Sequence, residues 1–497
     1  MYSIPINSMR VFIPFAMGYF LSYLYRVVNA VIAPDLVLDL NIDPSQLGLL
    51  TSTYFISFAS SQLALGVLLD RYGPRLINAS LLLIAATGAF VFARSHTLTG
   101  LVVGRALIGL GVSACLMAAF KAYVIWFPEK IWPRVNGFQM AAGGVGALTA
   151  TTPVEWMLKI TDWRGVFAGL AVLSLVIAAV LFFVVPQKKA MNNLPNDKDK
   201  QKHKKNESLK EQIAGIRVIF SSRNFWRAAP VTTLSQATFL SIQGLWIGPW
   251  LKDVAGLERH DIATILSLTA VAMITGFITL GMAAERLEQR GMDLLLVSIT
   301  GMAVFMAVQV LIILDIVSGA MPWVLFGFFG TSGIIAYAGL SRKFPGYLSG
   351  RVTTGINLLV FVTAFVAQWA IGAIIKLWDM GGAAVHAPSV ASAIKNGASQ
   401  TAQNYYAASG YKAGFAIMLM LQLAAVIWYF ISSKSTSYCF FRSSCIGLNQ
   451  DAQDAQDLQD KNLEHPVNPG YPDSDKFKKC QKVQQGVDFE NSKNPNF

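Results

Sequence analysis

The chain has 497 residues, of which 54% are hydrophobic and only 14% are charged, and its mean hydropathy is +0.47. A soluble domain of this size rarely buries so much apolar surface, so the composition excludes that class and predicts a multi-pass membrane protein. The net charge of +12 would suit a nucleic-acid partner. The basic residues, however, lie in loops without the interleaved aromatic side chains of a nucleic-acid interface, so we expect none.

About twelve apolar segments of roughly 20 residues follow one another, each long enough to cross about 30 Å of hydrocarbon. The expected spans are 10–33, 46–69, 77–94, 98–122, 136–158, 165–185, 226–251, 262–283, 292–314, 320–341, 352–377 and 412–432. The first is too long for a removed signal peptide and lacks its small-residue cleavage site. The pattern therefore predicts an all-α membrane protein with twelve transmembrane helices.

The charged residues divide between the two sides of these spans. The loop after the first span carries Asp35, Asp39 and Asp43 without Lys or Arg. Basic residues gather in the loops of the other side: Lys188, Lys189, Lys198, Lys200, Lys202, Lys204, Lys205, Lys210, Arg71, Arg75, Lys130, Arg134, Arg286, Arg290, Arg342, Lys343 and Arg351. Because cytoplasmic loops are enriched in Lys and Arg, both termini are predicted to be cytoplasmic, in a bacterial inner (plasma) membrane.

The first span contains an arginine, Arg26, past its middle. An arginine at mid-bilayer costs about 2.5–3.5 kcal/mol even on the most lenient insertion scale, so such a residue normally faces a cavity or the bundle interior. Tyr23 and Asn29 are three positions away and share its helix face. This polar, aromatic face is typical of a substrate site, although Arg26 paired with a helix C-terminus or a nearby acid is the structural alternative.

The loop after the second span has the pattern G-x-L-x-D-R-x-G-x-R. It is made by Gly66, Leu68, Asp70, Arg71, Gly73 and Arg75. This pattern resembles the loop between helices 2 and 3 of the major facilitator superfamily. The resemblance implies two six-helix bundles and secondary transport. We expect Asp70, Arg71 and Arg75 to take part in gating, where two helices must part on the cytoplasmic side.

Two further segments resemble the same superfamily. The string from Tyr23 to Asn29 is similar to the first helix of organophosphate:phosphate antiporters and anion:cation symporters, in which an arginine here meets the anion. Arg105, followed by Gly109 and Gly111, fits the fourth-helix motif L-x-x-x-R-x-x-x-G-x-G. The resemblance implies that Arg105 organises the bundle or takes part in proton coupling, and we include it with the substrate-site candidates. Lys121 either joins them in the cavity or extends to the cytoplasmic surface.

The fifth span carries a glycine run, Gly143-Gly144-Val145-Gly146, with no preceding strand. The run therefore predicts close helix packing instead of nucleotide binding. Glu155 follows Pro153 in the same span, and Asp35 lies at the exit of the first. These two acids are the candidates for proton coupling, and either could instead neutralise a basic residue.

The two halves of the sequence resemble each other at one offset. Phe127-Pro128 and Arg134 recur as Phe344-Pro345 and Arg351; Asp70-Arg71 recurs as Glu285-Arg286, which joins the gating candidates; and Pro34, Leu36 and Asp43 match Pro249, Leu251 and Glu258. Such a duplication predicts an N-terminal six-helix bundle at 1–185 and a C-terminal one at 226–433. We expect a basic cytoplasmic linker at 186–225 and a disordered cytoplasmic tail at 434–497.

The second half offers neutral groups where the first offers a charge. At the repeat offset Arg26 aligns with Ser241, half a turn from Gln243. We expect Gln243 and Trp246 to line the cavity, with an interfacial anchor as the alternative for Trp246. Asn357 in the eleventh span is a further polar candidate.

No catalytic constellation, phosphate-binding G-x-x-x-x-G-K-[ST] loop or metal-like histidine pair is present in the sequence, so we expect no enzyme, no cofactor and no metal. The prediction is a transporter, acting as a monomer in the lipid bilayer, that moves a small organic anion or zwitterion by alternating access. A proton or counter-anion gradient would drive it. The alternatives are a drug or siderophore exporter of the same fold and a non-transporting membrane receptor.

Overall fold

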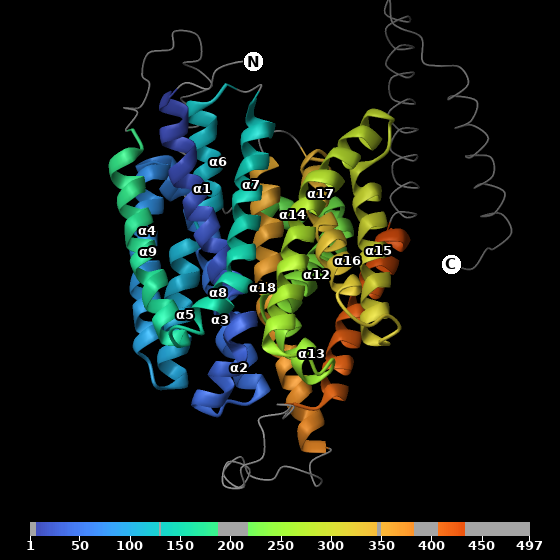
Figure 1. The fold of residues 1–497 in the computed structure, drawn as a ribbon. Coiled ribbons are helices and arrows are strands. Elements are labelled where there is room, and N and C mark those ends of the chain that lie inside the picture. The colour runs from blue at the N-terminus through green and yellow to red at the C-terminus, as the bar shows by residue number, and fades with distance from the viewer. Residues whose placement is uncertain (1–5, 129–130, 187–216, 345–348, 382–405, 433–497) are drawn as a thin grey trace, which may run out of the picture. The chain divides into compact units, whose positions relative to one another are not determined.

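The computed structural model describes residues 6–128, 131–186, 217–344, 349–381 and 406–432. The compact unit that ends at Val426 contains the arrangement described below. Most of its helices run alongside one another (Figure 1). The labelled helices are α1 Ile6–Val27, α2 Asn29–Leu40, α3 Pro44–Tyr72, α4 Pro74–Arg94, α5 Leu98–Val112, α6 Cys115–Trp126, α7 Trp132–Thr149, α8 Thr152–Met157, α9 Trp163–Val184, α12 Arg223–Ser241, η2 Ile242–Trp246, α13 Ile247–Asp253, α14 Arg259–Gln289, α15 Leu294–Ile313, α16 Met321–Phe329, η3 Gly330–Ser332, α17 Gly333–Ser341 and α18 Ser349–Gly381.

Within the described ranges, eight helices are long and apolar enough to cross a membrane, and the bent pair α1–α2 makes nine. The last of them, Ala408–Ser432, coincides with the twelfth expected span. The other three expected spans, 46–69, 136–158 and 226–251, also fall on helices. They are more polar or interrupted: α3 and α12 carry rows of buried Ser, Thr and Gln that face other helices.

Several expected spans are interrupted, and the sequence indicated such a break only next to Pro153. Span 10–33 is bent by 44° near Val28, where α1 gives way to α2, and the helix continues to Leu40. Backbone hydrogen bonds from Val28 N to Leu24 O at 3.0 Å and from Ile32 N to Val28 O at 3.2 Å cross this point. Val31 N also bonds to Val28 O at 3.1 Å, three residues back instead of four, so the regular α-helical pattern is interrupted at Val28.

The predicted internal repeat matches equivalent structural positions. Asp43 is the N-cap of α3 and Glu258 is the N-cap of α14. At the same offset, the bend at Val28 corresponds to η2, a π-helical turn. The first helix of each half is thus irregular at the same place. In the second half the irregularity arises because the π-helical turn holds one residue more than an α-helical turn.

The glycine run of α7 packs against other helices, as predicted. A Cβ on Gly146 would lie 2.1 Å from the carbonyl oxygen of Phe20 in α1, and one on Gly143 would lie 2.5 Å from the ring of Tyr19. A Cβ on Gly144 would lie 2.2 Å from Ile274 of α14. The glycines therefore allow α7 to contact α1 and α14 closely, which confirms the packing interpretation.

Candidate functional site

Arg26 lies among aromatic rings from three helices. Arg26 is only 7% exposed. The guanidinium carbon is 4.5 Å from the ring centroid of Tyr23 in α1, 5.3 Å from that of Phe361 in α18, and 5.8 and 6.0 Å from those of Phe58 and Tyr54 in α3. We call these four residues the aromatic cage. Each ring face attracts a cation, so the cage offsets part of the cost of burying the charge.

Among the described residues, none of the carboxylates forms an ion pair with Arg26. Its Nε is buried without a hydrogen-bond partner. In the described part of the chain, therefore, no neighbouring acid neutralises Arg26, which was the structural alternative. A buried guanidinium with an unpaired Nε–H is suited to a carboxylate, which can accept two parallel hydrogen bonds from a guanidinium.

Arg105 lies close to Arg26 but has different contacts. It is 1% exposed and its Nη1 donates to the backbone carbonyl of Tyr25 at 2.9 Å, one residue before Arg26. Its guanidinium carbon is 5.3 Å from the ring centroid of Tyr54, so this tyrosine lies between the two arginines. These contacts hold the end of α1 against α5, so Arg105 organises the bundle at this point. A part for Arg105 in proton coupling stays a prediction.

Asn29 and Asn357 are both paired with side chains of α3. Asn29 Nδ2 donates to Thr51 Oγ1 at 3.0 Å, beyond the bend in the first span. Asn357 Nδ2 donates to Gln62 Oε1 at 3.1 Å and so joins α18 of the second half to α3 of the first. The latter pair lies one helical turn from the ring stack of Phe58 and Phe361, whose centroids are 4.2 Å apart.

At the end of the molecule that carries α2 and α13 (Figure 1), ion pairs join the two halves of the chain. The Asp35 carboxylate accepts from Arg259 at 2.6 and 3.1 Å. The Asp43 carboxylate accepts from Lys376 at 2.9 Å. Asp35 thus neutralises an arginine, which was the structural alternative to proton coupling at this residue.

The ionisation of Asp43 is favoured by this pairing. Partial burial raises the pKa of its carboxyl, but the hydrogen bonds from Lys376 and the Gln46 backbone outweigh burial and leave the pKa below its ordinary value. The Asp43 side chain also caps α3, so one carboxylate both begins that helix and holds α18.

Two candidates of the second half are buried at the same end. Trp246 is fully buried, and its indole N–H donates to the backbone carbonyl of Gln368 in α18 at 3.0 Å. Its complete burial does not suit the alternative role of an anchor at the membrane surface. The neighbouring Trp250 is also buried and is stacked on Phe415. Gln243, in η2, is buried and directs its amide toward the sulfur of Met273 at 3.2 Å.

The remaining charged candidates are Glu155 and Lys121. Glu155 is 4% exposed and pairs with Lys159, one turn later, at 3.2 Å. Its helix α8 begins after an interruption of the span next to Pro153, as the sequence indicates. Lys121 is half-buried on α6.

The gating candidates lie at the opposite end from α2. Arg71 is exposed over the ring of Tyr72, and Arg75 lies 5.0 Å from the ring centroid of Phe182. Glu285 and Arg286 are exposed near the end of α14, and the side chain of Asp70 is outside the described set. The described contacts do not bring these residues together, so their gating role stays a prediction.

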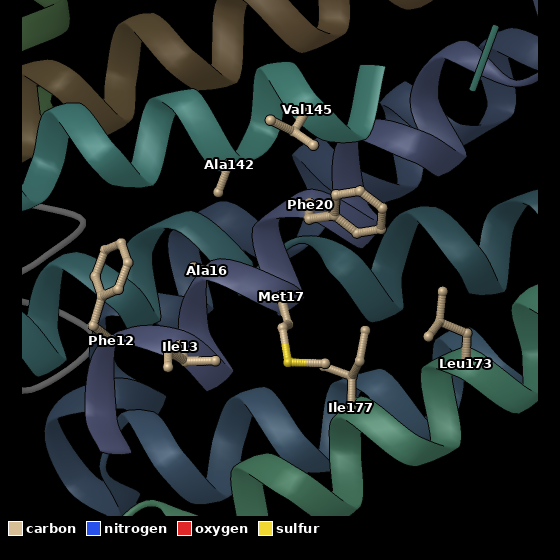
Figure 2. A pocket seen from close by; sticks show the side chains of 9 residues that line it. All are labelled: Phe12, Ile13, Ala16, Met17, Phe20, Ala142, Val145, Leu173 and Ile177. Carbon is tan, nitrogen blue, oxygen red and sulfur yellow. The ribbon is translucent and has the colours of Figure 1, made fainter. Parts of the chain in front are cut away.

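An apolar pocket of about 430 Å³ lies beside α1 (Figure 2). Its lining has no polar or charged side chain and consists of Phe12, Ile13, Ala16, Met17, Phe20, Ala142, Val145, Leu173 and Ile177. Because nothing in this lining can recognise a charged or hydrogen-bonding group, the chemistry points to Arg26 as the candidate site and not to this pocket.

Sequence reasoning missed the cage residues of the other helices, Tyr54, Phe58 and Phe361. The signal was an aromatic pair at i and i+4 on the Ser- and Thr-rich second span, which places both rings on one face. It also missed Asp253, which is 3% exposed and accepts a hydrogen bond from Tyr411 at 2.6 Å.

The comparisons with known proteins agree with this architecture. The sequence pattern of the Major Facilitator Superfamily matches residues 15–368, and the chain belongs to this family. A bacterial homolog of the human lysosomal transporter Spinster, solved in an inward-facing conformation, has a TM-score of 0.62 at 16% identity, with 87% of this chain and 98% of that chain covered. This likeness shows the fold alone.

Two curated relatives are named as transporters of different substrates, and a third is named as a multidrug resistance protein. The probable sulfoacetate transporter SauU of Cupriavidus necator is 23% identical over 368 residues, 71% of this chain and 85% of the relative. The hexuronate transporter of Escherichia coli is 24% identical over 252 residues, 50% of this chain and 58% of the relative. The multidrug resistance protein MdtL of Shigella flexneri is 28% identical over 253 residues, 50% of this chain and 59% of the relative.

Proposed function

We propose that this protein is a secondary transporter of a small organic anion or a zwitterion with a carboxylate. It would work by alternating access and be driven by a proton or counter-anion gradient. The observation that carries the proposal is the buried guanidinium of Arg26, which has ring faces around it and no carboxylate among the described residues within ion-pair distance. A substrate carboxylate would supply the missing counter-charge and accept two hydrogen bonds from it.

The relatives support this substrate class in part. Sulfoacetate and hexuronates are both anions, whereas the name of MdtL keeps drug export as the second candidate. A cationic drug would need an acid near the centre. Glu155 is paired with Lys159, and no described acid lies in the aromatic cage, so the site favours the anion.

The ion pairs at the α2 end support a route of access. With Asp35 and Asp43 joined to Arg259 and Lys376, a substrate would reach Arg26 from the opposite end. The excess of Lys and Arg in the loops of that opposite end favours a cytoplasmic orientation for it. In this proposal transport requires the two ion pairs to part in one half of the cycle, and the Gln62–Asn357 pair and the Phe58–Phe361 stack to part in the other.

The test is uptake of labelled sulfoacetate and glucuronate into proteoliposomes that hold the full-length protein. Arg26→Ala should lower transport a hundredfold or more, because two charge-assisted hydrogen bonds at about 1.5–3 kcal/mol each are lost. Arg26→Lys should fail almost as badly, since an ammonium lacks the planar fork. Arg94→Ala is the matched control, because Arg94 is exposed at the end of α4. Near-normal transport of either anion by Arg26→Ala would overturn the proposal.

A further inference from the structure

We infer that the anion recognised at Arg26 carries its carboxylate on a flat apolar body, an aromatic or alicyclic ring, and is not a polyhydroxylated sugar acid. This inference rests on the proposed function and names the substrate class of the same site.

The first argument is the composition of the wall around the guanidinium. The four cage rings come from α1, α3 and α18, so both halves of the chain contribute to them. Phe55 extends the same surface, with its centroid 5.9 Å from that of Phe361. A carboxylate bound to Arg26 would place the rest of its molecule against these rings. Ring faces gain free energy from apolar and aromatic contact and can replace few hydrogen bonds to water.

The second argument concerns the polar groups next to the cage, most of which are already bonded to each other, with the Asn29 Oδ1 as the exception. Asn29 is paired with Thr51, and Gln62 is paired with Asn357. The hydroxyl of Tyr54 donates to the backbone carbonyl of Ser22 at 3.2 Å. A hexuronate brings a hydroxyl on almost every carbon, and each buried hydroxyl left without a partner costs about 1–3 kcal/mol. Breaking the existing pairs would only transfer this cost to the protein.

A purely supporting role is the competing explanation of the cage. The rings would then stabilise Arg26 in the folded protein without touching the substrate. In that case, removing one ring would lower thermal stability but would weaken every bound anion by the same factor. If the ring contacts the substrate, its removal weakens ring-bearing anions selectively.

The experiment measures binding to the purified full-length protein by isothermal titration calorimetry at constant ionic strength. The probes are benzoate, cyclohexanecarboxylate and glucuronate. We expect both ring-bearing acids to bind at least tenfold more tightly than glucuronate, and Arg26→Ala to abolish their binding. Phe361→Leu should weaken benzoate about three- to tenfold, the range expected for one aromatic contact. Glucuronate should change little.

Two variants keep the result interpretable. Phe58→Leu removes the ring that stacks on Phe361 and should weaken benzoate in the same way as Phe361→Leu. The test therefore still works if one of the two variants folds poorly. Phe183→Leu is the control, because the Phe183 ring is 79% exposed on α9. Glucuronate binding that depends on Arg26 and equals or exceeds benzoate binding would overturn this inference and leave the proposed function standing. Binding of none of the three acids through Arg26, together with sulfoacetate transport that does not depend on Arg26, would overturn both.

Discussion

Gly146 in α7 allows a direct test of the packing around the site. A Cβ at this position would lie 2.1 Å from the carbonyl oxygen of Phe20, whereas ordinary contacts begin near 3.4 Å. Gly146→Ala therefore requires α1 and α7 to separate by more than 1 Å. Overpacking usually costs about 1–3 kcal/mol. Because the opposing atom belongs to the backbone and cannot rotate away, we expect the upper end, about 3 kcal/mol of unfolding free energy.

The chain supplies its own reporter for this measurement. Cys115 is fully buried on α6, so its thiol reacts with a fluorogenic maleimide only when the bundle opens. Replacing the tail cysteines, Cys439, Cys445 and Cys480, with serine leaves it as the single thiol. Thermal midpoints are then compared at one heating rate, since unfolding of such proteins is commonly irreversible. Gly146→Ala should lower the midpoint by several degrees.

Gly137 provides the matched control in the same helix. A Cβ there would have nothing within 4 Å, so Gly137→Ala should be neutral or slightly stabilising through helix propensity, by about 0.5–1 kcal/mol. Equal midpoints for Gly146→Ala and Gly137→Ala would refute the close approach of α1 and α7.

Three other predictions concern charged residues. The pKa of Asp43 is depressed, so its pairing with Lys376 stabilises the fold above the ordinary carboxyl pKa and is lost as pH falls through the depressed value. The partly exposed pair contributes about 0.2–1 kcal/mol. The difference in thermal midpoint between the wild type and Asp43→Asn should vanish at acid pH, and a constant difference would contradict this. Asp70→Asn should slow transport while the calorimetric affinity stays unchanged, because it alters a conformational equilibrium and not the site; lost affinity with normal cycling would count against it. If Glu155 carries the coupling proton, Glu155→Gln should lose accumulation driven by a pH gradient but retain counterflow, and if it only pairs with Lys159 both should persist.

The features that the sequence predicted correctly depend on local pattern. Apolar length placed the helices, the glycine run predicted close packing, and a charge in an apolar span pointed to an interior position for Arg26. Each of these follows from residues within one or two turns of each other. The polar spans 46–69 and 226–251 were also located correctly, although their buried hydroxyls and amides lower their hydropathy.

The missing parts depend on contacts between distant segments. Phe361 lies more than three hundred positions after Arg26, Arg259 lies 224 positions after Asp35, and Lys376 lies 333 positions after Asp43. An aromatic residue in an apolar span has many possible neighbours, so no spacing rule selects the ring that meets the guanidinium. The bend at Val28 was missed because no proline or glycine occupies the position and so nothing in the local sequence marks it.

The two halves share a topology but contribute differently to the site. The first supplies the charge, Arg26, whereas the equivalent residue Ser241 donates to the backbone carbonyl of Ala364 in α18. The second half reaches the guanidinium mainly through the ring of Phe361, which stacks on Phe58. Under the proposed function, a substrate therefore competes with a cation–π contact between the halves. A ligand shifts a conformational equilibrium only by its differential affinity for the two states. The anion must therefore gain more from Arg26 and the separated rings than the halves gain from holding Phe361 against the guanidinium, and this difference is what would couple binding to the rocking of the two bundles.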